Sequence, residues 1–172
     1  MEAGDIVTRY AVVDIETTGS NPKNGDEIIE IGIVVLEDER IIEEFSSYIN
    51  PGKDIPPFIT NLTGITNEDV QDAPSFGEMA NKVIALCKDS YFVAHHVQFD
   101  LVFLNETLIR EGFQPIKGKI IDTVELARIM TPMGSGFKLT QLAEHYHIYH
   151  KRPHRALSDA FVTGQLLIKL LN

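Results

Sequence analysis

The chain has 172 residues and a formal net charge of −10, from 25 acidic and 15 basic residues. Its length and its 44% of hydrophobic residues suit one folded domain with an ordinary core, so a single domain over residues 1–172 is expected. The acidic balance argues against a protein that holds nucleic acid through bulk positive charge, but it leaves open an enzyme whose carboxylates collect metal ions.

Three strands are predicted at the start of the chain, with no helix between them. Residues 10–16 form a short apolar run that ends in acids, and the turn-forming residues 17–22 follow. Residues 27–36 are rich in isoleucine and valine, and the acidic residues 37–39 turn the chain into a third strand over 40–49. This order indicates an antiparallel hairpin start to the sheet.

Strands and helices alternate in the rest of the chain. Ser75 and Glu78 form an S-x-x-E capping box, so a helix is predicted to begin near Phe76. The later predicted elements are a strand over 91–95, a helix over 99–111, a strand over 119–122, a helix up to residue 130, and two more helices around 139–146 and over 156–171. The fold class is therefore α/β, a mixed sheet with helices packed on it.

Asp14 and Glu16 stand two residues apart at the end of the first predicted strand. That spacing places both carboxylates on the same face of the strand. Two neighbouring carboxylates repel each other unless a cation or a proton lies between them. Taken alone, the pair is more simply interpreted as two solvated acids just beyond the end of the strand.

Three more residues have a similar double interpretation. Asp100 begins an apolar helical stripe and is either a partner of the helix dipole or a buried ligand. His154 and Asp159 stand about a turn and a half apart at the entry to the last helix. A histidine at such a position often has no functional role. The combination of these residues with the first acidic pair is far more specific than any one of them.

In chain order, the three motifs read D-I-E-T-T-G, H-H-V-Q-F-D and H-R-A-L-S-D. With these residues the chain resembles the DEDDh 3′–5′ exonucleases of the ribonuclease H-like fold, over nearly its whole length. It looks most like the proofreading epsilon subunit of bacterial DNA polymerase III, and it is similar to the exonuclease domain fused to some bacterial helicases. The resemblance implies one exonuclease domain that releases nucleoside 5′-monophosphates from the 3′ end of single-stranded DNA or RNA, in proofreading or repair.

The resemblance also implies a role for each motif residue. The family's four catalytic acids, which would hold two divalent cations, Mg²⁺ or Mn²⁺, fall on Asp14, Glu16, Asp100 and Asp159. The family's general base falls on His154, and an imidazole with an ordinary pKa of about 6.5 suits that task near neutral pH. The family's positions that hold the terminal nucleotides fall on Thr17, Thr18, Gly19, Leu62, Thr63 and Phe99.

One position departs from the family, and two alternatives stay open. Many members carry Asn where this chain has His96, which bears on a local hydrogen bond rather than on the acids. A catalytically idle nucleic-acid or protein-binding module of the same fold would need a broken acid set. A histidine-ligated metallohydrolase is the other alternative, although H-H and H-x-H spacings are weak signals and no H-E-x-x-H occurs. Its candidate ligands are His95, His96, His145, His147 and His150.

A partner is expected because the chain has few basic residues with which to hold nucleic acid. One locally basic stretch, residues 138–155, carries a net charge of +3, from four cations against one carboxylate: Lys138, Lys151, Arg152 and Arg155 against Glu144. Such a stretch supports about 2–4 phosphate contacts. A polymerase or helicase, in cis or in trans, is therefore expected to deliver the 3′ end.

A cytoplasmic protein with no membrane partner is expected. No apolar run approaches the ~20 residues that a membrane span needs, and residues 1–5 lack the basic and apolar regions of a secretory signal. Cys87 is the only cysteine, which excludes an internal disulfide and a multi-cysteine zinc site and favours a reducing compartment. Its place on an apolar helical stripe indicates that it belongs to the core.

Overall fold

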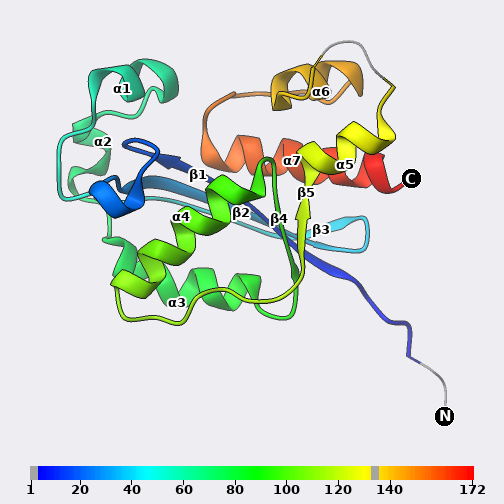
Figure 1. Cartoon of the computed structure of the whole chain (residues 1–172), viewed down its shortest axis with the longest axis horizontal. Coiled ribbons are helices and arrows are strands. Elements are labelled where there is room, and N and C mark those ends of the chain that lie inside the picture. The colour runs from blue at the N-terminus through cyan, green and yellow to red at the C-terminus, as the bar shows by residue number, and fades with distance from the viewer. Residues whose placement is uncertain (1–3, 133–135) are drawn as a thin grey trace.

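The structure, a computed structural model, describes residues 4–132 and 136–172. Its centre is a five-stranded sheet in the order β3-β2-β1-β4-β5 (Figure 1). The strands are β1 (Arg9–Thr17), β2 (Ile28–Glu37), β3 (Arg40–Tyr48), β4 (Tyr91–Ala94) and β5 (Ile120–Asp122). The first three strands pair antiparallel, whereas β4 runs parallel to β1 and β5 parallel to β4. The predicted hairpin start and the alternation that follows it are confirmed.

Helices cover both faces of the sheet. They are α1 (Pro57–Thr63), α2 (Asn67–Gln71), α3 (Phe76–Cys87), α4 (Val97–Arg110), α5 (Thr123–Met130), α6 (Leu139–His145) and α7 (Ala156–Leu171), with one 3₁₀ turn, η1 (Pro22–Asn24). The predicted capping box is present, since the Ser75 side chain accepts from the Glu78 N–H and the Glu78 carboxylate accepts from the Ser75 N–H. These caps satisfy N–H groups that the first turn of a helix leaves without partners.

Two short helices, α1 and α2, lie between β3 and α3, where the sequence predicted no helix or strand. Pro57 is the first residue of α1, a position at which proline fits because its missing N–H would have no partner there. Gly64, at φ 77°, ends the helix in the left-handed conformation that glycine tolerates best. Thr66 and Asp69 then form a capping box for α2. The proline-rich segment therefore starts a helix rather than an irregular loop.

Successive residues of β1 face opposite layers of the molecule. Val13 and Ile15 pack in the core shared with α3 and α4, whereas Val12 packs in the core shared with α7. In Figure 1, α3 and α4 lie on one side of the sheet and α7 on the other. Asp14 and Glu16 continue the alternation on the α7 side. Their position is set by the same pattern that buries the valines and isoleucines.

Gly32 allows α7 to approach the sheet at the acids. It lies opposite Asp14 in the β1–β2 register. A Cβ at this position would lie 2.4 Å from backbone atoms of Ala156 and Leu157, in the first turn of α7. Because glycine has no side chain, this turn rests directly on the sheet and brings Asp159 to the end of β1.

The structure bears on two further expectations, one about Cys87 and one about membrane-spanning helices. Cys87 is buried in α3, and burial raises the pKa of its thiol to about 12, which suits a core residue rather than a nucleophile. Within the described residues, no helix combines the length and the apolar character needed to cross a membrane. The first three residues of the segment considered for a secretory signal, 1–3, lie outside the described residues.

Candidate functional site

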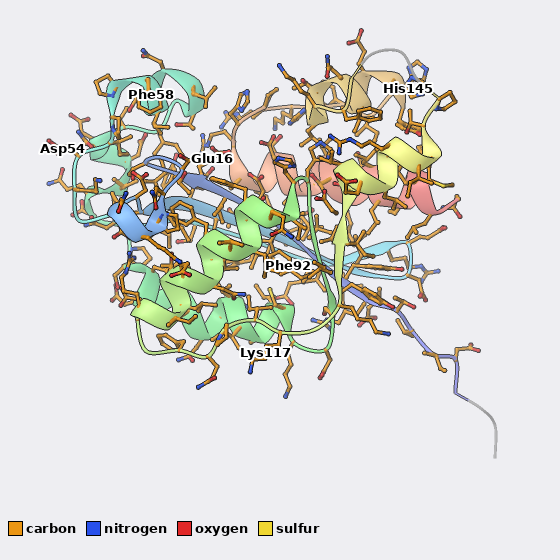
Figure 2. All side chains as sticks on the ribbon, viewed as in Figure 1. Glu16, Asp54, Phe58, Phe92, Lys117 and His145 are labelled. Carbon is orange, nitrogen blue, oxygen red and sulfur yellow. The ribbon has the colours of Figure 1, made fainter. Side chains whose placement is uncertain are left out.

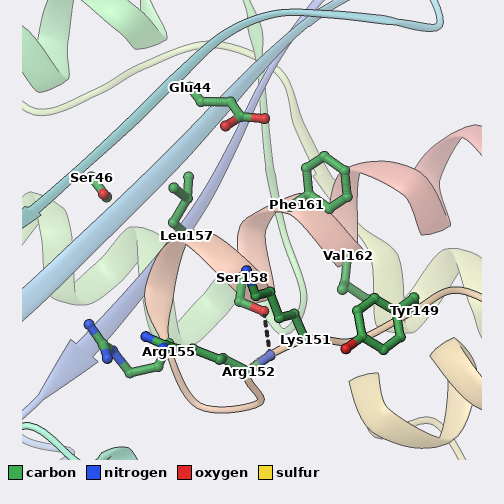
Figure 3. A pocket seen from close by; sticks show the side chains of 10 residues that line it. All are labelled: Glu44, Ser46, Tyr149, Lys151, Arg152, Arg155, Leu157, Ser158, Phe161 and Val162. Carbon is green, nitrogen blue, oxygen red and sulfur yellow. Dashed lines mark hydrogen bonds between the residues drawn. The ribbon is translucent and has the colours of Figure 1, made fainter.

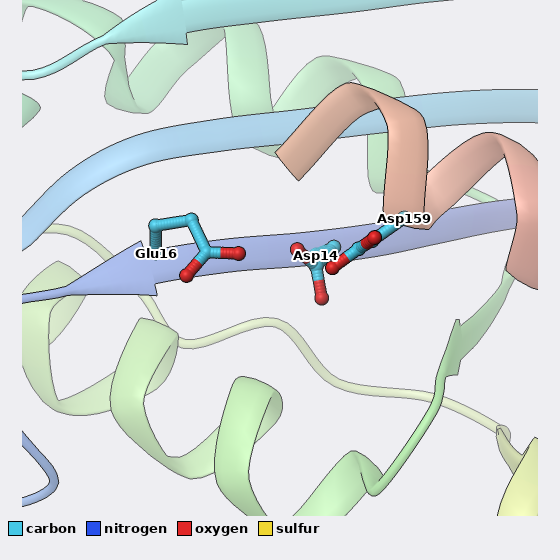
Figure 4. A group of neighbouring side chains, drawn as sticks. All are labelled: Asp14, Glu16 and Asp159. Carbon is cyan, nitrogen blue, oxygen red and sulfur yellow. The ribbon is translucent and has the colours of Figure 1, made fainter. Parts of the chain in front are cut away.

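Three carboxylates from two elements meet at the end of β1. Asp14 and Glu16 come from the strand and Asp159 from the first turn of α7, and one ligand atom from each lies within 4.8 Å of the others (Figure 4). In the part of the chain that the structure describes, this is the group of three His, Cys, Asp or Glu side chains that could hold a metal ion. The fold thus brings together residues that stand up to 145 positions apart in the sequence.

Asp100 reaches the same place from the opposite layer. It lies in the first turn of α4, is buried, and its Oδ1 accepts a hydrogen bond from the Ile15 N–H at 3.2 Å. Ile15 is the residue between the two acids of β1, so the carboxylate of Asp100 is held beside them. The fourth predicted acid is therefore adjacent to the cluster but not part of the closest group.

Crowding and burial disfavour the ionised carboxylates in the absence of a cation. Burial, then Asp100 and Glu16, raise the pKa of Asp14 well above its usual range. Burial, then Asp159, raise the pKa of Glu16 to about 9. The Oδ2 atom of Asp14 is buried without a hydrogen-bond partner. An unpartnered carboxylate oxygen among like charges is the arrangement that a hard divalent cation relieves, so these residues fit a magnesium- or manganese-type ion.

His154 lies next to this cluster on the loop that enters α7. The residue is exposed, has a positive φ of 63°, and its backbone N–H donates to Asp159 Oδ2 at 3.2 Å. Its imidazole is near enough to lower the pKa of Asp159, after the larger effect of burial, which raises it, and the effect of His150. The predicted general base is thus within the site and open to water.

His150 also contacts the acid cluster, which the sequence did not indicate. Its Nε2 and Asp159 Oδ1 lie 2.6 Å apart, and both side chains are largely buried. His150 lies in the loop between α6 and α7, and its ring contacts a carboxylate rather than the other candidate histidines. No spacing rule pairs residues 150 and 159, because the loop before α7 must fold back before the two can meet. In the sequence, only a search for polar residues near the last motif would have suggested this contact between His150 and Asp159.

The remaining histidines give no support to a zinc site. The Nδ1 atom of His95 pairs with Thr123 Oγ1 at 2.8 Å and its Nε2 with the Phe137 carbonyl at 2.7 Å, so both ring nitrogens are used. His145 packs edge-on against Tyr146, and His147 is exposed. Among the described residues, the metal-binding group contains no histidine.

His96 takes a backbone conformation that explains how it can replace Asn. Its φ and ψ are 80° and 58°, in the left-handed region where both Asn and His are enriched among non-glycine residues. The local hydrogen bond is made by its backbone N–H, which donates to Asp122 Oδ1 at 3.1 Å. The substitution therefore keeps the turn between β4 and α4.

The turn at residues 17–19 is held by hydrogen bonds of its threonine side chains. Thr17 Oγ1 donates to the Gly19 carbonyl at 2.6 Å, and Thr18 Oγ1 donates to Asp26 Oδ1 at 3.1 Å and accepts from the Glu27 N–H. A Cβ on Gly19 would lie 2.4 Å from the Asp26 carboxylate. The hydroxyls of both threonines are thus used inside the turn.

The apolar candidates gather on α1 and at the start of α4. Leu62 is 51% exposed, and Phe58, four residues earlier, is 65% exposed on the same helix. Thr63 is buried, with its hydroxyl donating to the Ile59 carbonyl, so it supports the end of α1. Phe99 is half-buried in α4 against the core. Phe58 was not among the sequence candidates, although its helical spacing to Leu62 was a usable signal.

Comparison with known proteins identifies relatives of this arrangement. The family model described as an exonuclease matches residues 11–167. The chain is 48% identical over 163 residues to the 3'-5' exonuclease DinG of Bacillus subtilis (strain 168) and 40% identical over 163 residues to that of Staphylococcus epidermidis. Each alignment covers 95% of this chain but only 18% of the relative, so the chain spans under a fifth of these proteins.

Two solved structures share the fold. Exonuclease X in complex with 5′-overhanging duplex DNA has a TM-score of 0.75 and 26% identity, covering 96% of this chain and 91% of that one. The nuclease domain of 3'hExo, a DEDDh family member bound to rAMP, has a TM-score of 0.82 and 24% identity, covering 98% and 94%. The expected ribonuclease H-like fold is confirmed.

Proposed function

Because the chain belongs to the exonuclease family whose model spans residues 11–167, and is thus a nuclease hydrolase, we propose that it hydrolyses single-stranded DNA from the 3′ end. The relatives named 3'-5' exonuclease DinG support this polarity, and the complex of Exonuclease X with DNA supports DNA as the substrate. The observation that carries the proposal is the short distance between the carboxylate of Asp159 and those of Asp14 and Glu16. The three together form a carboxylate site on one face of β1.

The acids are proposed to bind two divalent cations, Mg²⁺ or Mn²⁺. When bound, such ions activate water and stabilise the leaving oxygen of a phosphodiester. Asp14 would be shared between the ions, and Glu16 and Asp159 would hold the ion that activates the attacking water. Asp100, held by the Ile15 N–H, is proposed to act through water. His154 is proposed to take a proton from the attacking water, since it is the exposed imidazole beside Asp159.

The 3′-terminal nucleotide is proposed to lie between the turn after β1 and α1. The backbone at Thr17, Thr18 and Gly19 is proposed to close this end, so that a chain terminus would fit and a continuing strand would not. Leu62 and Phe99 offer apolar surfaces for bases, with Thr63 supporting Leu62. Figure 2 shows Glu16 at the same end of the molecule as Phe58 of α1, with Lys117 on the far side of Phe92.

The domain is proposed to work as part of a larger assembly in the cytoplasm. The chain spans 18% of its DinG relatives, so the proteins that resemble it carry much more chain than this domain. A linked helicase or polymerase partner would raise the local concentration of the 3′ end. The single exonuclease domain over residues 1–172, a repair or proofreading role and the likeness to the epsilon subunit remain predictions.

A digestion experiment tests the function. A 5′-labelled single strand, with Mg²⁺ or Mn²⁺, should shorten stepwise from its 3′ end and release 5′-monophosphates, whereas a 3′-phosphate should block it. Asp14→Asn should abolish cleavage, and Asp89→Asn is the matched control, because Asp89 is an exposed acid at φ 53° that Asn tolerates. Cleavage of circular single strands, or full activity in excess chelator, would contradict the proposal.

A further inference from the structure

A second feature of the site is a groove that the proposed roles leave unused. It has a volume of about 700 Å³, and His154 and Asp159 are among the residues that line it. Arg128 of α5 and Lys138, just before α6, supply the cationic side chains of its lining. The groove therefore joins an acid of the reaction site to two cationic side chains.

The position of the groove relative to α1 gives it a direction. In Figure 1, α1 lies on one side of the end of β1, and α5 and α6 lie on the other. The terminal nucleotide is proposed to lie on the α1 side, against the turn at residues 17–19. With the scissile phosphate at the acids, a strand that continues away from α1 would run past α5 and α6, where the groove lies.

We propose that this groove binds the single strand on the 5′ side of the scissile bond, with Arg128 and Lys138 contacting its phosphates. The inference rests on the proposed exonuclease function and extends it to the path of the substrate. Phosphate contacts of this kind add affinity without reading sequence, which suits an enzyme that degrades any strand.

The wall of the groove is held in place by His95. Its ring joins Thr123, at the start of α5, to the Phe137 carbonyl, one residue before Lys138. The Arg128 guanidinium lies 5.8 Å from the centre of the Phe137 ring. The Arg128 guanidinium and the backbone next to Lys138 thus belong to the same wall, which lowers the entropic cost of binding a strand there.

Arg128 also pairs with Glu125 at 2.6 Å, but this pair does not remove it from solvent. The two side chains are 53% and 62% exposed. An exposed ion pair at this helical spacing contributes little free energy, so a phosphate can compete for the guanidinium. The pair holds Arg128 at the rim of the groove without consuming its binding capacity.

The other cations of the predicted basic stretch lie elsewhere. Lys151 and Arg152 border a different groove, between β3 and α7, together with Glu44 and Arg155 (Figure 3). That groove contains neither His154 nor any acid of the cluster. Arg155 is bound to Glu30. The basic stretch read from the sequence is therefore divided by the fold, and only Lys138 lies on the proposed strand path.

The test compares two pairs of substitutions that remove the same charge. Arg128→Gln with Lys138→Gln removes the proposed contacts, and Lys151→Gln with Arg152→Gln is the matched control. The substrates are a 12-nucleotide single strand and the p-nitrophenyl ester of thymidine 5′-monophosphate, which has no strand on the 5′ side of its phosphate. Strand affinity is also measured by fluorescence anisotropy, with Ca²⁺ in place of Mg²⁺ to suppress cleavage.

The groove pair should lower the strand-to-ester ratio of kcat/KM, mainly through KM, by about tenfold at physiological salt. The slope of log affinity against log salt should become shallower by about 1.4, from two lost contacts at ~0.7 each. The control pair should change the ratio less than about twofold.

The outcomes distinguish a failure of the groove proposal from a failure of the proposed exonuclease function. An equal loss in both pairs, or a larger loss in the control pair, would overturn the groove while leaving exonuclease activity standing. If the chain cleaves neither substrate, the proposed function fails. In that case, a strand affinity, measured by anisotropy, that falls only in the groove pair still supports the groove. An affinity that does not differ between the two pairs overturns it.

Discussion

Glu30 and Arg155 connect the centre of the sheet to the loop that carries His154. The Arg155 Nε donates to Glu30 Oε1 at 3.1 Å and its Nη2 to Oε2 at 2.7 Å, while the Ala156 N–H donates to Oε1 at 2.7 Å. Arg155 also donates to the Tyr48 hydroxyl at 2.8 Å. Because Arg155 directly follows His154, this pair fixes the start of α7 beside the acids.

Replacing Arg155 should therefore reduce both stability and activity. Arg155→Ala leaves the Glu30 carboxylate, 7% exposed, without its cation, and the free energy of unfolding should fall by about 3 kcal/mol. Urea unfolding at neutral pH measures it. Arg155→Lys should recover part of the loss, since it keeps the charge but not the two-point geometry. A loss below about 0.5 kcal/mol in Arg155→Ala would show that the pair contributes no more than an exposed one.

The metal-free protein should lose stability as pH rises. Glu16 has a pKa of about 9 in the folded chain, above the ordinary value of 4.5, so the folded state holds more protons between these values. The contribution of this pKa shift to the free energy of unfolding is fully present below about pH 4.5 and is lost as pH rises toward 9. Melting temperatures in chelator should fall across this range, and added Mg²⁺ or Mn²⁺ should reverse the fall.

Asp14→Asn serves as the check on that explanation. Removing one charge from the cluster should raise the metal-free melting temperature at pH 8 and flatten its dependence on pH. Asp89→Asn, far from the cluster, should do neither. A pH profile that is the same in wild type and Asp14→Asn would assign the dependence to other groups.

His154→Ala should lose about 10²–10⁴-fold in turnover while still binding metal and strand, because a positioned general base acts mainly on the chemical step. Its exposure predicts little change in unfolding. Single-turnover cleavage at saturating enzyme, alongside anisotropy, separates the two effects. Native turnover in the variant would show that His154 only begins the last helix.

His150→Ala should weaken metal binding by about 10–100-fold without unfolding the chain, because the ring holds Asp159 through a 2.6 Å contact. Mn²⁺ binding, followed by electron paramagnetic resonance, is the readout. His150→Gln, whose amide can donate from a similar position, should restore part of the affinity. Equal affinity in wild type and His150→Ala would make the contact a packing feature.

The isolated domain should degrade strands distributively. The formal charge of −10 and the division of the basic stretch leave few phosphate contacts, so the enzyme should dissociate often. Labelled strand is prebound, and metal is added together with excess unlabelled strand. Short products should dominate. Long runs of degradation in the presence of this competitor would show processivity and remove the need for a tethering partner.

Local signals in the sequence were sufficient for most elements. The apolar runs of β1 and β2, the Ser75 capping box and the stripe of α7 each carry their pattern within a few residues. The helix α1 was missed because a pair of prolines, such as Pro56 and Pro57, can either interrupt regular structure or occupy the start of a helix. The sequence alone does not distinguish these two cases. The motif acids were identified through the family resemblance, since each one singly has a simpler interpretation.

By itself, the sequence determined which residues are available: four acids, a histidine before the last helix and a short turn after the first strand. It also determined, through the period of two in β1, that Asp14 and Glu16 share a face. Only the tertiary structure decided that His150 contacts Asp159, that Glu30 holds Arg155, and that the basic stretch divides between two grooves. These contacts join residues by how the layers and loops pack, and packing distances are not encoded in the spacing of residues along the chain.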